Sequence, residues 1–511
     1  MMAADLHEKR HNWIRRHWTG GFSLGISYWI VGWIGNAAIL VIALAVGAVV
    51  NNSRQPWTAV TALVMVWTFI LGVALWQFRG TWRSASRTTQ KTGRYLWPRV
   101  AKIFLVLGAL NAATIVIGTG LPQLSDALAY ATGDLTEGPR GVRILRDGTE
   151  LEVTGFFGYG LAQELEATLR QAPSAKVVHL ASRGGRVAVA LDIRDVIRSH
   201  GLDTYVATSC ASACTIAFLA GQTRWAAQDA KLGFHRFSSP GADIGVMNRS
   251  VRETYAAAGL HGAFLEHVQA TPPEQLWYPS MVELVAASVV TAHAATNRFA
   301  LSGFGLHPVP EEVENRLLGV AAFAALRAID PVGWRIVRDA WVRAVEDGRP
   351  ETAAAALTKA QFAKAGALAR PIMPDGAAMA FARQMILETK AIQATAPEPC
   401  FAYITFGNID LGAYLPADLM KSDIEMTTQL FTEAAAHPAQ RVQPSEGNRL
   451  MNAILAALQT RGADPNRVFA GITGGSPHDQ ACPSLWQIYE AALSLPAGDA
   501  AAAIRFLAGG R

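Results

Sequence analysis

Acidic residues are almost absent from the first fifth of this 511-residue chain. Up to and including Lys102 there are two acids against twelve Lys and Arg, which leaves 33 basic and 38 acidic residues for the rest. The basic excess behind the net charge of +5 therefore belongs to the N-terminal segment. A protein that binds nucleic acid through its globular part needs a basic face there. The composition thus argues against nucleic acid as a partner.

Zinc-site spacing is also lacking. None of the four Cys and 12 His residues stands in the paired arrangement that a structural zinc site requires. We expect neither a metal ion nor another cofactor.

Charge is missing altogether from three long apolar runs, residues 22–50, 57–76 and 103–121. Each approaches the ~20 apolar residues that a membrane-spanning helix needs, and Trp and Tyr cluster at their ends. The first run is too long, and has too many successors, for a cleaved signal peptide. The sequence predicts a membrane domain over residues 1–122 with three transmembrane helices; the alternative is buried core helices of a soluble protein.

The basic residues of this segment indicate its orientation. All but Arg54 lie before the first run or in the loop expected between the second and third runs, from Arg79 to Lys102. Cytoplasmic loops are rich in Lys and Arg, so the chain after Pro122 is expected on the extracytoplasmic side. We predict a multi-pass protein of the plasma (inner) membrane with a periplasmic C-terminal part. The basic loop could also contact anionic membrane lipid.

Strand and helix patterns alternate from about Gly141. Short apolar strands are expected at 142–145, 150–154, 176–181, 204–207, 223–226 and 231–235, and helices at 161–169, 187–199 and 210–219. This alternation is typical of an α/β domain with largely parallel strands. We place that domain at residues 140–304.

Three features of this domain are the minimum parts for acyl transfer. Ser212 opens a helix directly after a strand, Gly184-Gly185 follows another strand, and His235 ends a third. They supply a nucleophile, backbone N–H donors and a general base. Taken singly, each has a structural interpretation: a small packing residue or cap, a tight turn and a satisfied structural histidine.

The order and spacing of these motifs resemble the Clp protease proteolytic subunit, within the Clp/crotonase superfamily. The motifs are Leu180-Ala-Ser-Arg-Gly-Gly-Arg, Cys210-Ala-Ser-Ala-Cys and Leu232-Gly-Phe-His, and the resemblance covers about residues 142–291. It implies a spiral of βαβ units, with Ser212 as nucleophile and His235 as base. It also implies an oxyanion hole formed by the N–H groups of Gly184 and Ala213, and assembly as a homo-oligomer.

The sequence departs from the family pattern in two places. Arg183 replaces the usual proline, and no aspartate stands at 272–276, where the third residue of the triad is expected; Glu274 is the nearest acid. Without an orienting carboxylate, activity is expected to be weaker. Membrane serine proteases related to signal peptide peptidase A use a serine–lysine dyad, but Lys231 is expected to face solvent. An acyl-CoA enzyme is disfavoured by the outward topology.

The cysteines fall into two pairs. Cys210 and Cys214 would be too far apart on one regular helix for a relaxed disulfide, so we favour two small buried residues. A disulfide, and with it a redox gate over Ser212, requires Cys210 to lie off the helix. Cys400 and Cys482 are expected to pair, because an outward-facing domain permits disulfides.

After about Gly305 the chain is alanine-rich, and a helical domain is predicted over residues 305–511. Helices are expected at 313–328, 331–346, 352–368, 377–394, 415–435, 446–460 and 484–495. The pairs Asp330-Pro331 and Asp464-Pro465 mark joints between helical segments. No catalytic pattern stands out there.

The sequence as a whole favours a membrane-tethered serine hydrolase, a peptidase that acts on a peptide or protein at the extracytoplasmic face. Two alternatives remain. One is a catalytically weak or inactive Clp-like scaffold that binds peptides, and the other is a partner-binding protein whose C-terminal helices carry the function.

Overall fold

The computed structural model describes residues 13–52, 56–132, 138–237, 244–294, 297–405, 409–475 and 478–509. The chain forms two compact units. One comprises Met1–Arg143 and Leu151–His293, and the other comprises Ile144–Glu150 and Ala294–Arg511. The division into domains at 1–122, 140–304 and 305–511 stays a prediction.

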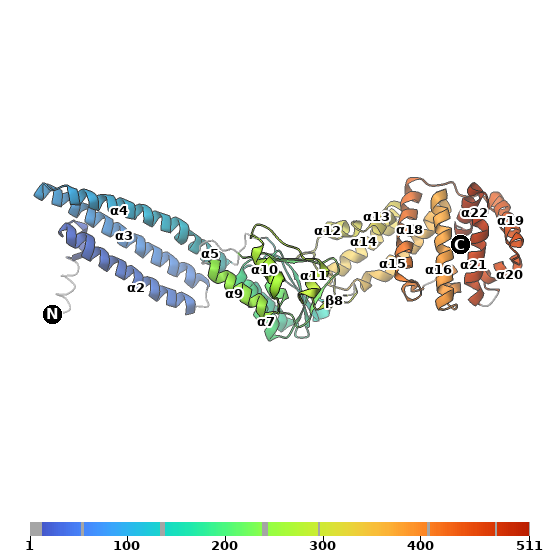
Figure 1. Cartoon of the computed structure of the whole chain (residues 1–511), viewed down its shortest axis with the longest axis horizontal. Coiled ribbons are helices and arrows are strands. Elements are labelled where there is room, and N and C mark those ends of the chain that lie inside the picture. Colours follow the sequence, from blue (N-terminus) through green and yellow to red (C-terminus); the bar gives the residue numbers. More distant parts are fainter. Residues whose placement is uncertain are drawn as a thin grey trace. The chain divides into compact units, whose positions relative to one another are not determined.

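The N-terminal part of the chain is helical (Figure 1). Its elements are η1 (Ile26–Ile30), α2 (Val31–Asn52), α3 (Pro56–Thr92), α4 (Leu96–Ile115), η2 (Val116–Gly120) and α5 (Leu121–Thr132). Three stretches are long and apolar enough to cross a membrane: Ile26–Val46, Trp57–Thr92 and Leu96–Ala129. Large apolar side chains lie exposed on them, as in Trp29 and Trp33, which is the pattern of a surface that faces lipid.

The basic segment after the second apolar run is not a loop, and that prediction is wrong. Arg79 to Lys91 belong to α3, which ends at Thr92; the next residue, Gly93, has a φ of +66°. Arg and Lys are good helix formers, so charge alone does not end a helix. A glycine in the left-handed region does.

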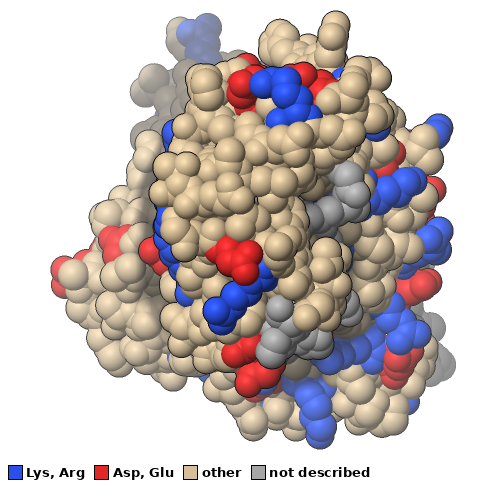
Figure 2. All heavy atoms as spheres, turned by 90° about the vertical axis from the view of Figure 1, so that its right-hand side faces the viewer, with Lys and Arg blue, Asp and Glu red and all other residues tan. Residues whose placement is uncertain are grey.

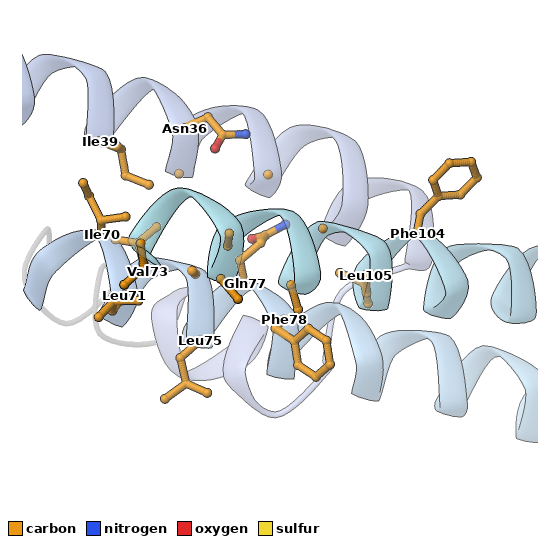
Figure 3. A pocket seen from close by; sticks show the side chains of 18 of the residues that line it. Asn36, Ile39, Ile70, Leu71, Val73, Leu75, Gln77, Phe78, Phe104 and Leu105 are labelled. Atoms are coloured by element: carbon orange, nitrogen blue, oxygen red, sulfur yellow. The ribbon is translucent and has the colours of Figure 1, made fainter. Parts of the chain in front are cut away.

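Helices α2, α3 and α4 line an apolar groove of about 790 Å³ (Figure 3). Small residues such as Gly32 and Gly35 form part of its wall, and Tyr28, Asn36 and Gln77 contribute polar side chains. A Cβ at Gly32 would lie 3.0 Å from Gln77 Nε2. The same Nε2 donates to the Ser27 carbonyl at 3.1 Å, which ties α3 to η1. Small residues and amide hydrogen bonds of this kind hold helices together inside a membrane.

The middle of the chain is an α/β region built on two sheets. Its elements are β1 (Gly141–Leu145), η3 (Arg146–Gly148), β2 (Glu150–Thr154), α6 (Leu161–Gln171), β3 (Val177–Ala181), α7 (Val187–Ser199), β4 (Asp203–Val206), β5 (Ser209–Ala211), α8 (Ala213–Phe218), β6 (Arg224–Ala226), β7 (Lys231–Gly233), α9 (Ile244–Ala257), α10 (Gly262–Ala270), α11 (Met281–Ala286) and β8 (Ala292–His293). The larger sheet has the order β1-β2-β3-β4-β6-β8, and β5 pairs with β7 in the smaller one. The pairs β3–β4, β4–β6, β6–β8 and β5–β7 are parallel.

Apolar spacing explains these elements. Val189, Ile193 and Ile197 recur at helical spacing along α7 and are buried. They share one hydrophobic core with Val178 and Leu180, which alternate on β3. A mixed α/β region therefore follows the apolar helices, as its sequence pattern indicates.

The segment 210–219, predicted as one helix, is instead a strand followed by a shorter helix. Cys210 and Ala211 belong to β5, and α8 begins at Ala213. The physical reason is pairing: Ser209, Cys210 and Ala211 stand in parallel register with Lys231, Leu232 and Gly233 of β7. This local sequence of small residues has no helical period that would have distinguished the two states.

The C-terminal region is helical. Its elements are α12 (Pro310–Leu318), α13 (Ala321–Ile329), α14 (Pro331–Glu346), α15 (Thr352–Ala369), η4 (Arg370–Ile372), α16 (Asp375–Thr395), α17 (Cys400–Ile404), η5 (Leu411–Ala413), α18 (Ala417–Ala436), α19 (Pro444–Thr460), α20 (Pro465–Thr473), η6 (His478–Gln480), α21 (Ala481–Leu493) and α22 (Ala497–Gly509). Asp330 and Asp464 cap α14 and α20 by accepting backbone N–H bonds. The helix predicted at 313–328 is two helices, because Gly319 ends α12.

Charges of both signs are interspersed on the face that includes the C-terminal helices (Figure 2). Among the C-terminal helices, Arg449 forms ion pairs with Glu446 and Asp499, and Arg505 pairs with Asp375. Exposed pairs of this kind contribute little to stability.

Candidate active site

The Ser212 turn joins β5 to α8. Ser212 has a φ of 55° and a ψ of −129°, a conformation that residues other than glycine seldom adopt. Its N–H donates to the Gly233 carbonyl of the neighbouring β7 at 2.8 Å, which fixes the turn against that strand. Such a sharp turn between a strand and a helix presents a serine hydroxyl at the helix N-terminus.

His235 lies two residues after the end of β7, because this strand stops at Gly233 and not at His235 as predicted. Because β5 and β7 run parallel in register, the chain leaves both strands at the same end, close to Ser212 and His235. The hydroxyl of Ser212 and Nε2 of His235 are 2.6 Å apart. With the imidazole neutral and its proton on Nδ1, Ser212 Oγ donates to Nε2, which is the arrangement of a nucleophile and its general base.

The environment of His235 favours the neutral base. Burial lowers the pKa of the half-buried imidazole from its ordinary value of 6.5, and the negative charge of Glu274 opposes this in part. Among the residues that the structure describes, Nδ1 of His235 has no hydrogen-bond partner. Glu274 itself is exposed and acts on His235 by charge alone. In the described part of the chain, His235 therefore lacks the carboxylate that would orient it.

Gly184 lies directly against the Ser212 turn. A Cβ at this position would be 2.8 Å from the Ala211 carbonyl oxygen, 2.8 Å from Ser212 Cβ and 3.0 Å from the Ala213 nitrogen. Its φ of +102° also favours glycine. No other residue could bring a backbone so close to the serine.

The two predicted oxyanion donors are in different states. Within the described residues, the N–H of Ala213, at the first position of α8, has no acceptor and is free to receive developing negative charge. The N–H of Gly184 donates to Ser182 Oγ at 3.0 Å. Its use as an oxyanion donor would require sharing or breaking that bond. The next residue, Gly185, is held by the backbone of Phe157, which bonds the Gly184 carbonyl and the Arg186 N–H, both at 2.9 Å.

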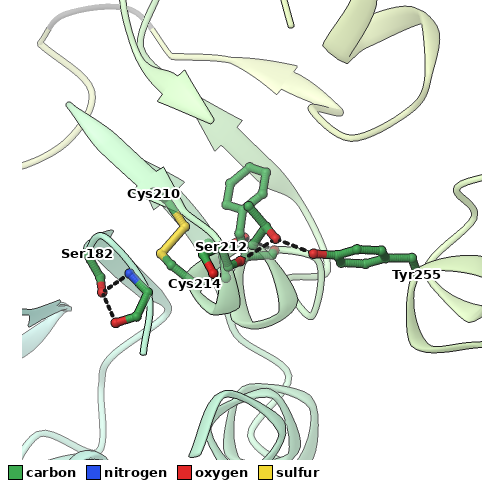
Figure 4. Close-up of a disulfide and its surroundings, with 9 residues drawn as sticks. Ser182, Cys210, Ser212, Cys214 and Tyr255 are labelled. Carbon is green, nitrogen blue, oxygen red and sulfur yellow. Dashed lines mark hydrogen bonds between the residues drawn. A yellow bond between two sulfur atoms is a disulfide. The ribbon is translucent and has the colours of Figure 1, made fainter. Parts of the chain in front are cut away.

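A disulfide joins Cys210 to Cys214 across Ser212 (Figure 4). The two cysteines are small buried residues, as expected, but the prediction that they are not bonded is wrong, because Cys210 lies on β5 and not on the helix. The two Cα atoms are 5.4 Å apart, within the ordinary range for a disulfide. Both residues are completely buried, which makes the bond a clamp inside the turn and not an exposed thiol pair.

The other residues singled out by the sequence lie apart from this centre. Lys231 is exposed and stands opposite Ser209, three residues before the serine. Arg183 is exposed beside the glycine pair. Cys400 of α17 and Cys482 of α21 form a second disulfide, with Cα atoms 5.2 Å apart. No group of three or more His, Cys, Asp or Glu side chains that could hold a metal occurs among the described residues.

Two residues that the sequence gave no reason to select also belong to the turn. Thr215 Oγ1 bonds the Ser212 carbonyl oxygen at 2.7 Å, and the Tyr255 hydroxyl bonds Thr215 Oγ1 at 2.7 Å. The only local signal is a hydroxyl residue three positions after the serine. Nothing in the sequence links Tyr255 to it.

No model of a known protein family matches this chain, and no curated protein matches it significantly. Among solved structures, a point mutant of ClpP1 from Listeria monocytogenes is 19% identical, over 30% of this chain and 94% of that chain, with a TM-score of 0.26. ClpP1 from the same organism is 18% identical, over 29% of this chain and 92% of that chain, also with a TM-score of 0.26. The similarity to ClpP1 is thus weak, and such a TM-score supports no argument about function.

Proposed function

We propose that this protein is a membrane-tethered serine hydrolase, a peptidase that cleaves a peptide or protein substrate with Ser212 and His235. The contact that carries the proposal is the 2.6 Å distance between Ser212 Oγ and His235 Nε2, made in a serine turn of positive φ. Structural serines have no need of an uncommon backbone conformation that aims the hydroxyl at an imidazole. The N–H of Ala213 next to it, which has no acceptor in the described part of the chain, supports the same interpretation.

The geometry suggests the following steps. Nε2 of His235 takes the hydroxyl proton as Ser212 Oγ attacks the substrate carbonyl carbon. The carbonyl oxygen becomes an oxyanion and accepts a hydrogen bond from Ala213 N–H. His235 returns the proton to the leaving amine as the C–N bond breaks, which leaves an acyl ester on Ser212. Water activated by the same imidazole then releases the acid and restores the hydroxyl.

Labelling by a fluorophosphonate tests this proposal on the detergent-solubilised full chain. We expect wild type to be labelled, and Ser212→Ala and His235→Ala to be unlabelled. Ser209→Ala is the matched control, because it removes a hydroxyl from the same β5 strand without touching His235. Labelling that survives Ser212→Ala would assign the reactivity to another residue.

A catalytically inactive scaffold of the same fold is the second candidate. It is favoured by one observation: within the described residues His235 Nδ1 has no partner, and Gly184 N–H is engaged by Ser182. An imidazole without an orienting acceptor is a weaker base in serine hydrolases. A folded wild type that binds peptides but never reacts with the fluorophosphonate would favour the scaffold.

The proposal includes an extracytoplasmic location for the residues after Pro122. The basic residues of the N-terminal segment support it by the positive-inside rule, and the two disulfides support it because such bonds persist in oxidising compartments. Protease added outside intact spheroplasts is expected to digest the α/β and helical regions. Protection of these regions until lysis would reverse the topology. A homo-oligomer and a Clp/crotonase-like spiral remain part of the proposal.

A further inference from the structure

The carbonyl of Ser212 is held by a relay of two buried hydroxyl groups. Thr215 Oγ1 is 2.7 Å from the Ser212 carbonyl oxygen and 2.7 Å from the hydroxyl of Tyr255. Thr215 and Tyr255 are both completely buried, and Tyr255 comes from α9, 40 residues along the chain from Thr215. Figure 4 shows the hydroxyl end of Tyr255 directed at the Ser212 turn.

Proton counting fixes the direction of this relay. A carbonyl oxygen can only accept, so the single hydroxyl proton of Thr215 goes to Ser212. Thr215 Oγ1 must then accept its other bond, which makes Tyr255 the donor. Burial raises the pKa of the Tyr255 hydroxyl far above its ordinary value of 10, so the proton stays in place throughout the working pH range.

The carbonyl held in this way belongs to the peptide that carries the oxyanion donor. Ser212 C=O and Ala213 N–H share one planar trans peptide unit and point in opposite directions. Any rotation of the carbonyl therefore turns the N–H by the same angle. Thr215 N–H also bonds this carbonyl at 3.0 Å, but only the side-chain relay extends to another element.

We propose that Tyr255 is a positioning residue of the serine site, which acts through Thr215 to aim the Ala213 N–H at the developing oxyanion. The inference rests on the proposed function. The aromatic ring has a second task, because it packs against Phe234 and Phe237 on either side of His235, with ring centroids 6.2 and 6.3 Å away. Tyr255→Phe keeps that packing and removes the hydroxyl alone.

The chain offers a matched control at the other end of α8. Thr204 is also completely buried, and its Oγ1 donates to the Phe218 carbonyl, the last of α8, at 2.8 Å. Thr204→Val and Thr215→Val therefore remove the same kind of bond from the same helix, but only the second bond reaches Ser212. Thr215→Ser keeps the hydroxyl and should restore what Thr215→Val loses.

The test is the fluorophosphonate reaction of the full chain in detergent, resolved into a saturation concentration and a maximal rate, with thermal unfolding followed in parallel. Because removal of a whole oxyanion donor costs roughly 100- to 1,000-fold, we expect its misalignment to slow the maximal rate about tenfold in Tyr255→Phe and Thr215→Val. The saturation concentration and the pH midpoint should stay unchanged, since His235 is untouched. Thr215→Ser and Thr204→Val should react within about twofold of wild type.

Each outcome has one meaning. Wild-type rates in Tyr255→Phe and Thr215→Val, with wild type labelled, would overturn the relay and leave the proposed function standing. An equal slowing in Thr204→Val would reduce the relay to general support of α8 and would also overturn it. An unlabelled wild type would overturn the proposed function and this inference together. If Tyr255→Phe does not fold, the comparison of Thr215→Val with Thr215→Ser decides alone.

Discussion

Replacement of Gly184 by alanine is the sharpest perturbation of the proposed site. The added Cβ would lie 2.8 Å from the Ala211 carbonyl oxygen and 3.0 Å from the Ala213 nitrogen, closer than carbon approaches either atom without a shift. The backbone there also has a φ of +102°, which alanine rarely adopts. The methyl group would therefore stand over the N–H that we assign to the oxyanion.

The chain contains a control that separates these two effects. Gly160, at the start of α6, has a φ of +93°, and apart from its chain neighbours no heavy atom of the described residues lies within 4 Å of an added Cβ. The free energy of unfolding of Gly160→Ala should thus fall only by the cost of the backbone conformation, roughly 1–2 kcal/mol. Gly184→Ala adds a steric clash of about 1–3 kcal/mol, so its stability should fall further.

Activity should separate the two variants far more than stability does. With its oxyanion donor covered, Gly184→Ala should react with a fluorophosphonate roughly 100- to 1,000-fold more slowly than wild type. Gly160→Ala should keep the wild-type rate at temperatures where it is folded. Both would be measured beside thermal unfolding, so that loss of fold is not taken for loss of chemistry. A Gly184→Ala variant that stays folded and reacts at the wild-type rate would refute the assignment of the Ala213 N–H as oxyanion donor.

Three further predictions concern pH and the second disulfide. The rate at which Ser212 reacts should rise with pH, with a midpoint below 6.5, because burial lowers the pKa of His235. Glu274→Gln should lower this midpoint further, since it removes the negative charge that raises the pKa of His235. A midpoint above 6.5 in wild type would contradict the burial argument. In the helical region, burial and the nearby Asp423 raise the pKa of Glu388 from 4.5 to about 7, so the folded state holds this proton more tightly than the unfolded chain. Its contribution to stability should be complete below pH 4.5 and disappear as pH rises through 7, and denaturant titrations should show a flatter profile for Glu388→Gln. The Cys400–Cys482 bond closes a loop of 82 residues. Its loss should lower the free energy of unfolding of this region by roughly 2–5 kcal/mol. Equal unfolding midpoints with and without reductant would count against the bond.

Elements with a full amphipathic period and a clear start were predictable. The helix at 187–199 was predicted with the bounds that α7 has, because its buried residues recur at helical spacing. The helix at 331–346 was equally clear, since Asp330-Pro331 supplies both a cap and a first residue of fixed φ. Both signals lie within the helix or directly before it, so they do not depend on a distant part of the chain.

Features that depend on distant partners were not predictable. The strand at Cys210 exists because β7 pairs with it, and the disulfide with Cys214 follows from that strand. Tyr255 meets Thr215 only in the folded state, and no spacing in the sequence announces the contact. The bond from Gly184 N–H to Ser182 is similar, because a Gly-Gly turn does not reveal which acceptor its N–H groups will find. The candidate residues could therefore be named from the sequence, but their disulfide and hydrogen-bond partners could not.

The disulfide across Ser212 and the charge pattern of the membrane helices both indicate on which side of the membrane the α/β region lies, and they do so for unrelated physical reasons. The charge pattern concerns which loops cross a membrane during insertion. The disulfide concerns which compartment lets a thiol pair stay oxidised. An acyl-CoA enzyme needs a cytoplasmic cofactor, and there both cysteine pairs would be reduced and the Ser212 turn would lose its clamp. Alkylation of the protein taken directly from cells, without reductant, separates the cases: four blocked cysteines fit the extracytoplasmic hydrolase, and four reactive ones would return the α/β region to the cytoplasm and reopen the acyl-CoA alternative.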